Sequence, residues 1–249
     1  MSIAGNLARI HERVARAAQR AQRTPEQIAL MAVTKTHPAE RIIEAYDAGH
    51  RLFGENRVQE FAEKFSALGG LDHAEFHMIG HLQSNKAGKA VEIFHAVDSL
   101  DSAKLGDRLN AAAAKLGKII GVLIEINIGG EDAKSGIAPD SPELEAILTS
   151  AGAPSSSPTV GESVGSSGWP HLRIQGLMTV PPFTDNPEDA RPYFRRLREL
   201  RDKLAARKLP AVSLDQLSMG MSHDFEVAIE EGSTCVRVGT AIFGEREKQ

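Results

Sequence analysis

The feature that most constrains the fold is an alternation of short apolar runs with amphipathic stretches that continues along the whole chain. Short apolar runs bounded by turn residues indicate buried strands, and the stretches between them have helical periodicity. The pattern predicts strands at residues 28–34, 51–54, 75–79, 94–98, 119–128, 172–178, 214–218 and 235–238. It predicts helices at residues 3–21, 38–48, 56–68, 84–92, 101–116, 141–150, 188–207 and 223–231. Repeats of this kind within 249 residues predict an α/β protein, a (β/α)8 TIM-type barrel, with one domain spanning residues 1–249.

One segment, residues 150–168, interrupts the repeats because it is rich in Gly, Ser and Pro and has almost nothing to bury. We interpret it as a flexible insertion. It separates a predicted helix from the next strand, so it should leave the barrel at the N-terminal rim, opposite the end where such barrels bind ligands. We expect Trp169, at its end, to be a surface anchor for the loop and not a platform for a ligand.

Composition and charge argue against several classes of partner. The net charge is −4 and the arginines gather only in predicted helices, so nucleic acid is not expected as a partner. No apolar stretch has the length of a membrane span, and no hydrophobic signal core is present, so we expect a cytoplasmic protein without a membrane partner. Cys235 is the single cysteine, which rules out an internal disulfide, and its apolar neighbours indicate a small buried side chain. In the first predicted helix, Ile3, Leu7, Ile10 and Val14 form a stripe that should dock on the barrel.

Lys35 is the first candidate for chemistry. It closes the apolar run that begins at Ile28 and is followed by Thr36, His37 and Pro38, so it should lie at the C-terminal edge of a buried strand. Ligands bind at that edge of an α/β barrel. A partly desolvated lysine has a pKa below its ordinary value of about 10.4 and becomes a nucleophile for carbonyl compounds. Lys35 is therefore a Schiff-base candidate, although a lysine that only extends its amine from a strand end to solvent fits the same pattern.

The ends of the last two predicted strands indicate an anion site. Both segments are rich in glycine and hydroxyl residues, and barrels of this type commonly bind phosphate between these loops, at the N-terminus of a short helix. Gly and Ser also mark ordinary turns, but here both segments lie at the expected position. The candidates for the cradle are Ser218, Gly220, Ser222, Gly239 and Thr240. A Schiff-base lysine together with a phosphate site implies pyridoxal 5′-phosphate (PLP).

Several short motifs occur in order along almost the whole chain. They are Ala32–Thr36, Phe53–Glu60, His77–Lys86, Lys134–Gly136, Gly176–Met178, Leu217–Ser222 and Val236–Thr240. With these motifs the chain resembles the YggS/PROSC family of PLP homeostasis proteins, which is related to the barrel domain of alanine racemase. The resemblance implies a fold-type III PLP barrel without the C-terminal β-domain that alanine racemases carry.

The resemblance also implies roles for individual residues. It makes Lys35 the Schiff-base lysine and Arg237 the partner of the pyridine nitrogen. Ser218, Gly239 and Thr240 would contact the phosphate, and the pocket would be lined by Asn56, His77 and Met178. Glu55, next to Asn56, could orient the ligand or cap the following helix, and the sequence leaves both open.

Arg237 bears on whether the protein is an enzyme. A guanidinium cannot accept a hydrogen bond and stays charged, so it disfavours protonation of a pyridine nitrogen that faces it, and the ring is then a poor electron sink. Racemases that resemble this barrel work with an arginine, but they need a tyrosine from a separate β-domain. Tyr46 and Tyr193 are the only tyrosines, and both fall in predicted helices away from the strand ends. We therefore expect a carrier, with weak racemase activity left open.

His73, His77 and His81 recur every four residues, a spacing that would place them on one face of a helix as metal ligands. The sequence between them favours a strand, which would separate the three rings, so no metal is expected. The prediction is a monomeric protein that holds PLP on Lys35 and supplies or buffers it, with PLP-dependent apo-enzymes as candidate recipients. The alternatives are a barrel-only PLP-dependent amino-acid racemase or lyase that uses Lys35 as its base, and a phosphosugar aldolase that uses Lys35 without a cofactor.

Overall fold

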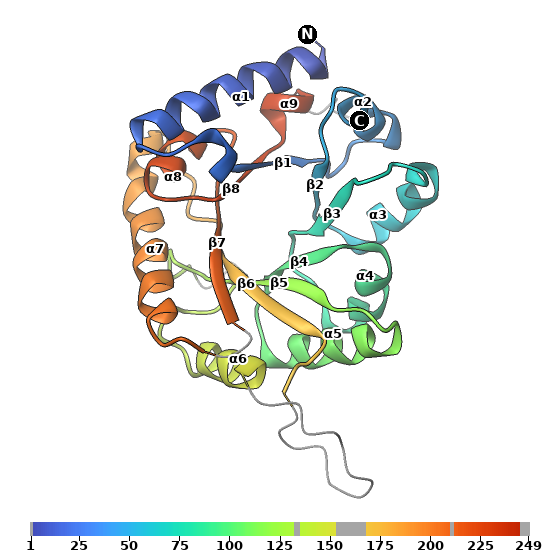
Figure 1. The fold of residues 1–249 in the computed structure, drawn as a ribbon, viewed down its shortest axis with the longest axis vertical. Helices are drawn as coiled ribbons and strands as arrows, with labels where there is room; N and C mark the ends of the chain where they lie inside the picture. The colour runs from blue at the N-terminus through green and yellow to red at the C-terminus, as the bar shows by residue number, and fades with distance from the viewer. Residues whose placement is uncertain (1, 132–134, 153–167, 210–211, 245–249) are drawn as a thin grey trace, which may run out of the picture.

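The computed structural model describes residues 2–131, 135–152, 168–209 and 212–244. Eight parallel strands follow each other in chain order around a closed barrel, and the last strand pairs with the first (Figure 1). They are β1 (Ala29–Val33), β2 (Leu52–Glu55), β3 (Glu75–Met78), β4 (Ala96–Leu100), β5 (Ile120–Glu125), β6 (Leu172–Met178), β7 (Val212–Met221) and β8 (Cys235–Val238). The predicted barrel is confirmed.

Helices surround the strands, as the outer ring in Figure 1 shows. They are α1 (Ile3–Arg20), α2 (Ala39–Asp47), α3 (Val58–Phe65), α4 (Ala87–Ile93), α5 (Ala103–Lys115), α6 (Pro142–Gly152), α7 (Arg191–Ala205), α8 (Phe225–Glu230) and α9 (Thr240–Phe243). Short 3-10 turns lie at Pro25–Gln27, Ser66–Leu68, Ser84–Lys86 and Pro187–Ala190. Within the described ranges, no helix combines the length and the apolar character needed to span a bilayer.

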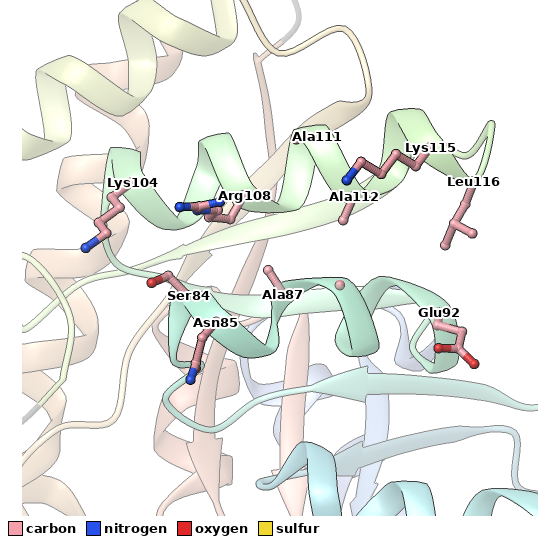
Figure 2. A pocket seen from close by; sticks show the side chains of 11 residues that line it. Ser84, Asn85, Ala87, Glu92, Lys104, Arg108, Ala111, Ala112, Lys115 and Leu116 are labelled. Carbon is pink, nitrogen blue, oxygen red and sulfur yellow. The ribbon is translucent and has the colours of Figure 1, made fainter.

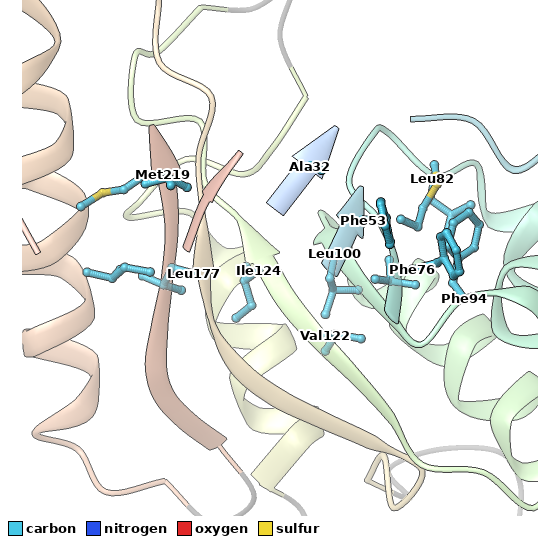
Figure 3. Packing of buried hydrophobic residues seen from close by; sticks show 14 of the residues in the cluster. Ala32, Phe53, Phe76, Leu82, Phe94, Leu100, Val122, Ile124, Leu177 and Met219 are labelled. Atoms are coloured by element: carbon cyan, nitrogen blue, oxygen red, sulfur yellow. The ribbon is translucent and has the colours of Figure 1, made fainter. Parts of the chain in front are cut away.

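The core lies between the strands and the helical ring. Parallel strands are covered on both faces, which is why their sequences are nearly continuous apolar runs. Phe53 of β2 and Phe76 of β3 stack with ring centroids 5.3 Å apart, and Phe61 of α3 lies 4.8 Å from Phe76. Phe94 completes this aromatic cluster at 4.7 Å from Phe61 (Figure 3). The cluster anchors α3 on the outside of β2 and β3.

Helix α1, at the N-terminus, packs against the C-terminal helices α8 and α9. Ile3, Leu7, Ile10 and Val14 are buried, as predicted from their stripe. The side chain of Asn6 donates a 2.6 Å hydrogen bond to the carbonyl of Ile242, and α1 lies against α8 and α9 (Figure 1). The N-terminal helix therefore holds in place the short C-terminal helix that follows β8.

The predicted insertion starts later than expected, because α6 continues to Gly152. Its residues 153–167 lie outside the described ranges. The prediction that Trp169 is a surface anchor is wrong: its side chain is 3% exposed and its indole N–H donates a 2.9 Å hydrogen bond to Asp107. The ring fits because residue 106 is glycine, where a Cβ would lie 2.2 Å from Cη2 of Trp169. The backbone N–H of Trp169 also bonds the carbonyl of Ser150 at 3.1 Å, so the two flanks of the insertion are held together.

An ionised pair occupies the N-terminal end of the barrel. His77 Nδ1 donates to Asp98 Oδ1 at 3.1 Å, and Glu75 Oε2 lies 3.8 Å from His77 Nε2. Burial acts to lower the pKa of His77, but the charges of Asp98 and Glu75 outweigh it and raise the pKa to about 9. These side chains line a cavity of about 410 Å³ together with Cys235. Burial raises the pKa of the Cys235 thiol to about 12, consistent with the predicted small buried side chain.

The Trp169 contact predicts opposite effects for two glycine substitutions. Gly88→Ala in α4 meets no atom within 4 Å, so the protein should become about 0.5 kcal/mol more stable through the better helix propensity of alanine. Gly106→Ala makes the same change of propensity in α5 but forces the buried indole to move, and should cost about 1–3 kcal/mol. Urea unfolding of both variants measures the difference, and equal stabilisation of the two would contradict the contact.

The His77–Asp98 pair predicts a pH-dependent contribution to stability. Because the folded-state pKa of His77 lies above the ordinary 6.5, its stabilisation is complete below about pH 6.5 and is lost as the pH rises through about 9. The difference in unfolding free energy between wild type and His77→Gln should shrink by up to about 3 kcal/mol from pH 6 to pH 10. Burial lowers the pKa of His95, so the difference for the control His95→Gln should stay constant between pH 7 and pH 10. A constant difference for His77→Gln over the same range would refute the assignment.

Candidate functional site

Lys35 lies in a turn at the C-terminal end of β1, two residues beyond the strand and not at its last position. The N–H of Thr34 still bonds to the carbonyl of Gly54 in β2, at 3.0 Å, and the N–H of His37 closes the turn on the carbonyl of Thr34 at 3.1 Å. Thr36 has a left-handed backbone with φ of 65°. The turn, named here the Lys35 turn (Thr34–His37), therefore places the half-buried Lys35 at the rim of the barrel.

The loops after β7 and β8 meet beside one another. The N–H of Gly239 donates to Ser222 Oγ at 3.3 Å, which joins the two loops. Gly220, near the end of β7, has φ of +94°, and a Cβ there would lie 2.5 Å from Cβ of Ala228, so only glycine lets the end of the strand approach α8. Thr240 opens α9, in which the amides of Ile242 and Phe243 bond the carbonyl of Gly239. Together these residues offer the amides and hydroxyls that an anion requires.

This cradle adjoins the Lys35 turn. Strand β8 pairs with β1 so that Val238 faces Ala32, and a Cβ on Gly239 would lie 3.3 Å from the carbonyl oxygen of Val33. On the other side, the ring of His37 packs 4.9 Å from the ring of Phe243 in α9. Barrel closure thus brings an amine and an anion cradle, from opposite ends of the sequence, to one mouth.

Arg237 lies below this mouth and is 4% exposed. Its Nη1 donates to Ser218 Oγ at 2.6 Å and its Nη2 to the carbonyl of Thr179 at 2.7 Å. Burial lowers its pKa, while the charges of Asp98, Glu125 and Asp224 act in the opposite direction. Met178, in register with Ser218, is fully buried beside it. Because the Ser218 hydroxyl accepts a hydrogen bond from Arg237, the contact of Ser218 with a phosphate stays a prediction.

Glu125 is a site residue that the sequence analysis missed. It ends β5 in register with Met178, is 4% exposed, and accepts a 2.7 Å hydrogen bond from Ser135 on Oε1. Its Oε2 has no partner among the described residues, and burial raises its pKa. The signal was present, because Glu125 follows the apolar run Val122–Ile124 just as Lys35 follows its own run. It was overlooked because the predicted strand extended past it to residue 128.

The structure places Asn56 and Glu55 in different environments. Asn56 follows β2 at the mouth, where a Cβ on Gly80 would lie 2.4 Å from its carbonyl oxygen, so the glycine permits close approach of the loop after β3. Glu55 neither caps α3 nor faces solvent: α3 begins at Val58 without a side-chain cap, and Glu55 is fully buried. It accepts a hydrogen bond from Thr34 and pairs with Lys64. The prediction that Glu55 caps α3 is wrong, whereas its role in orienting a ligand stays a prediction.

The structure does not bring His77 to this mouth. It lines the cavity at the opposite end of the barrel, together with Ala29 and Thr234 at the start of β1 and β8. His73 lies in a turn with φ of 60°, and His81 bonds Asp101 at 2.9 Å, so the three histidines have separate environments. Within the described ranges, no three His, Cys, Asp or Glu side chains are arranged to hold a metal ion.

A second depression lies outside the barrel, between α4 and α5 (Figure 2). It has a volume of about 580 Å³, and Lys104, Arg108 and Lys115 of α5 face Glu92 and Ser84 across it. Its lining comes from the helical ring and contains none of the predicted site residues. The residues that the sequence predicted for the site, apart from His77, lie instead at the C-terminal ends of the strands.

Known proteins match this chain along nearly its whole length. Residues 5–247 match the family described as alanine racemase, N-terminal domain. The pyridoxal phosphate homeostasis protein of Aquifex aeolicus is 44% identical over 249 residues, which cover 99% of this chain and 100% of that protein. The protein of the same name from Escherichia coli is 41% identical over 248 residues, covering 98% of this chain and 97% of that protein.

Solved structures agree. PipY from Synechococcus elongatus, solved with PLP bound, is 35% identical with a TM-score of 0.78, covering 98% of this chain and 100% of that one. Alanine racemase from Clostridium difficile is 14% identical with a TM-score of 0.70, and the match covers 100% of this chain but 58% of the racemase, a likeness of fold alone. The family resemblance is confirmed: the chain belongs to the alanine racemase N-terminal domain family and, within it, to the pyridoxal phosphate homeostasis proteins.

Proposed function

We propose that this protein binds PLP at the barrel mouth, holds it as a Schiff base on Lys35, and supplies it to PLP-dependent apo-enzymes or buffers it. The observation that carries the proposal is the juxtaposition of the Lys35 turn with Gly239, the residue that precedes α9, across the β1–β8 pairing. The PLP bound to PipY and the names of the curated relatives support it. The proposal includes a single domain over residues 1–249 that acts as a monomer in the cytoplasm.

The residues present fit the cofactor. The cradle at Ser222, Gly239 and Thr240 offers amides and hydroxyls to a phosphate, and the buried guanidinium of Arg237 hydrogen-bonds neutral oxygens, so it can face a ring nitrogen. Asn56 and Met178 are proposed as the lining. When bound, PLP supplies an aldehyde carbon for an amine and a ring that withdraws electrons from it. Arg237 keeps its charge and disfavours a proton on that ring.

The positions of the tyrosines favour carriage over racemisation. The Tyr46 hydroxyl, in α2, donates to the carbonyl of Asp72 at 3.0 Å, and Tyr193 packs against the core from α7. Neither lies at the mouth, so neither can move a proton on the face opposite Lys35. An enzyme that inverts an amino acid needs an acid on one face and a base on the other. Carriage needs only reversible binding, which an amine, a cradle and a guanidinium provide.

The Schiff-base assignment is tested by reduction. Borohydride treatment of the protein loaded with PLP should fix the cofactor on Lys35, because this is the lysine next to the cradle. Lys35→Ala should lose the absorbance band of the bound cofactor, whereas Lys89→Ala, which removes an exposed lysine of α4 paired with Glu92, should keep it. Peptide mapping identifies the modified residue. A label found only on Lys86 or Lys134 would refute the assignment.

Carrier and racemase are separated by incubating L-alanine with stoichiometric PLP-loaded protein. We expect D-alanine to form hardly faster than with free PLP, because both tyrosines lie in the outer helices α2 and α7 and not at the strand ends. The same preparation should restore activity to a cofactor-depleted transaminase. Chiral chromatography and the reactivation assay are run side by side. Rapid D-alanine formation that Lys35→Ala abolishes would instead establish the racemase.

A further inference from the structure

We infer that Lys64, together with Glu55 and Glu60, is a positioning group that clamps the backbone on both sides of Lys35. The inference rests on the proposed role of Lys35 and adds residues that this role does not by itself require. The three side chains come from β2 and α3, which follow helix α2 in the chain. Glu60 and Lys64 contact the backbone of the turn.

The ammonium of Lys64 is the centre of this clamp. Its Nζ donates to the carbonyl of Thr34 at 3.3 Å and to the carbonyl of His37 at 3.1 Å, the first and last residues of the Lys35 turn. The same Nζ lies 2.7 Å from Glu55 Oε1 and 3.4 Å from Glu60 Oε1. Its side chain is 11% exposed, so these charges interact with little screening by solvent. One buried cation thus ties the turn to two carboxylates.

Glu60 holds the strained residue of the turn. Its Oε1 accepts a hydrogen bond from the N–H of Thr36, whose φ of 65° is unfavourable for a β-branched residue. Such a conformation persists only where surrounding contacts fix it. Glu60 and Lys64 are one helical turn apart in α3, so the helix presents an acceptor and a donor to the same short segment. The conformation that directs Lys35 is therefore imposed from outside the turn.

Glu55 supplies the negative charge that balances the ammonium of Lys64. It is fully buried, and its Oε1 also accepts a 2.7 Å hydrogen bond from the hydroxyl of Thr34. Its Oε2 has no partner among the described residues, and burial raises its pKa while Lys64 acts in the opposite direction. A buried carboxylate without its cation is costly. Lys64 and Glu55 therefore fix each other, and both fix the carbonyl and hydroxyl of Thr34, the residue before Lys35.

The test compares Lys64→Met, which keeps an unbranched apolar stem and removes the charge, with the matched control Lys89→Met on the surface of α4. Glu60→Gln keeps an oxygen that can accept from Thr36, and Glu60→Ala removes it. Glu60 is partly exposed, so these two variants provide a second test if Lys64→Met does not fold. Two rates are measured: the reaction of Lys35 with trinitrobenzenesulfonate in the protein without PLP, read by peptide mapping, and the capture of added PLP, read by absorbance.

We expect PLP capture in Lys64→Met and Glu60→Ala to slow by about tenfold or more, because Lys35 is no longer held in the orientation that reaction requires. The captured PLP should still be attached to Lys35. Lys89→Met should behave as wild type, and Glu60→Gln should recover most of the rate. The trinitrobenzenesulfonate rate at Lys35 should change in the same two variants. Unchanged rates for both Lys64→Met and Glu60→Ala overturn the clamp while Lys35 remains the Schiff-base lysine. If borohydride fixes PLP on another lysine of the wild-type protein, the proposed function is overturned. The trinitrobenzenesulfonate rates then decide whether the clamp still acts on Lys35.

Discussion

The pairing of β8 with β1 is the interaction on which the rest of the structure depends. Four residue pairs, from Ala29 with Cys235 to Ala32 with Val238, close the sheet on itself. Closure removes the sheet edges, and it places the residue that follows β1 beside the loop that follows β8. A nucleophile near residue 35 and an anion cradle near residue 240 become neighbours only through these pairs. Helix α1 supports the closure from outside by bonding the carbonyl of Ile242.

The interior of the barrel separates two kinds of ionised group. At the C-terminal end, Arg237 is buried with neutral oxygen acceptors from Ser218 and Thr179. At the N-terminal end, His77 is paired with Asp98. The guanidinium hydrogen-bonds neutral oxygens and feels the nearby carboxylates only at longer range, whereas the imidazole of His77 bonds a carboxylate directly. The two ends of the same barrel therefore differ in what they can bind, although both carry buried cations.

Much of the architecture could be predicted from the sequence because its period is strong. The eight strands occur close to their predicted positions, and the stripe Ile3, Leu7, Ile10 and Val14 is buried as expected. Boundaries were less accurate where a turn or a cap decides them: β4 begins two residues late because α4 runs to Ile93, and α6 extends into the predicted insertion. Trp169 was misplaced because the space it fills is created by Gly106, which is distant in the sequence.

For the site, the sequence by itself determined the residue types and the strand ends to which they belong: Lys35 after the first strand, Asn56 after the second, Met178 in the sixth, and Ser218 to Thr240 along the last two. It did so because a polar residue that ends an apolar run in a βα repeat lies at the ligand-binding edge. Only the tertiary structure decided which of them meet. His77 lies at the N-terminal end of the barrel, and Glu125 lies at the C-terminal end beside Met178. The hydroxyl of Ser218 accepts a hydrogen bond from Arg237, and Glu55 is a buried partner of Lys64. The physical reason is that strand tilt, register and side-chain direction fix these contacts, and they depend on pairings between residues far apart in the chain.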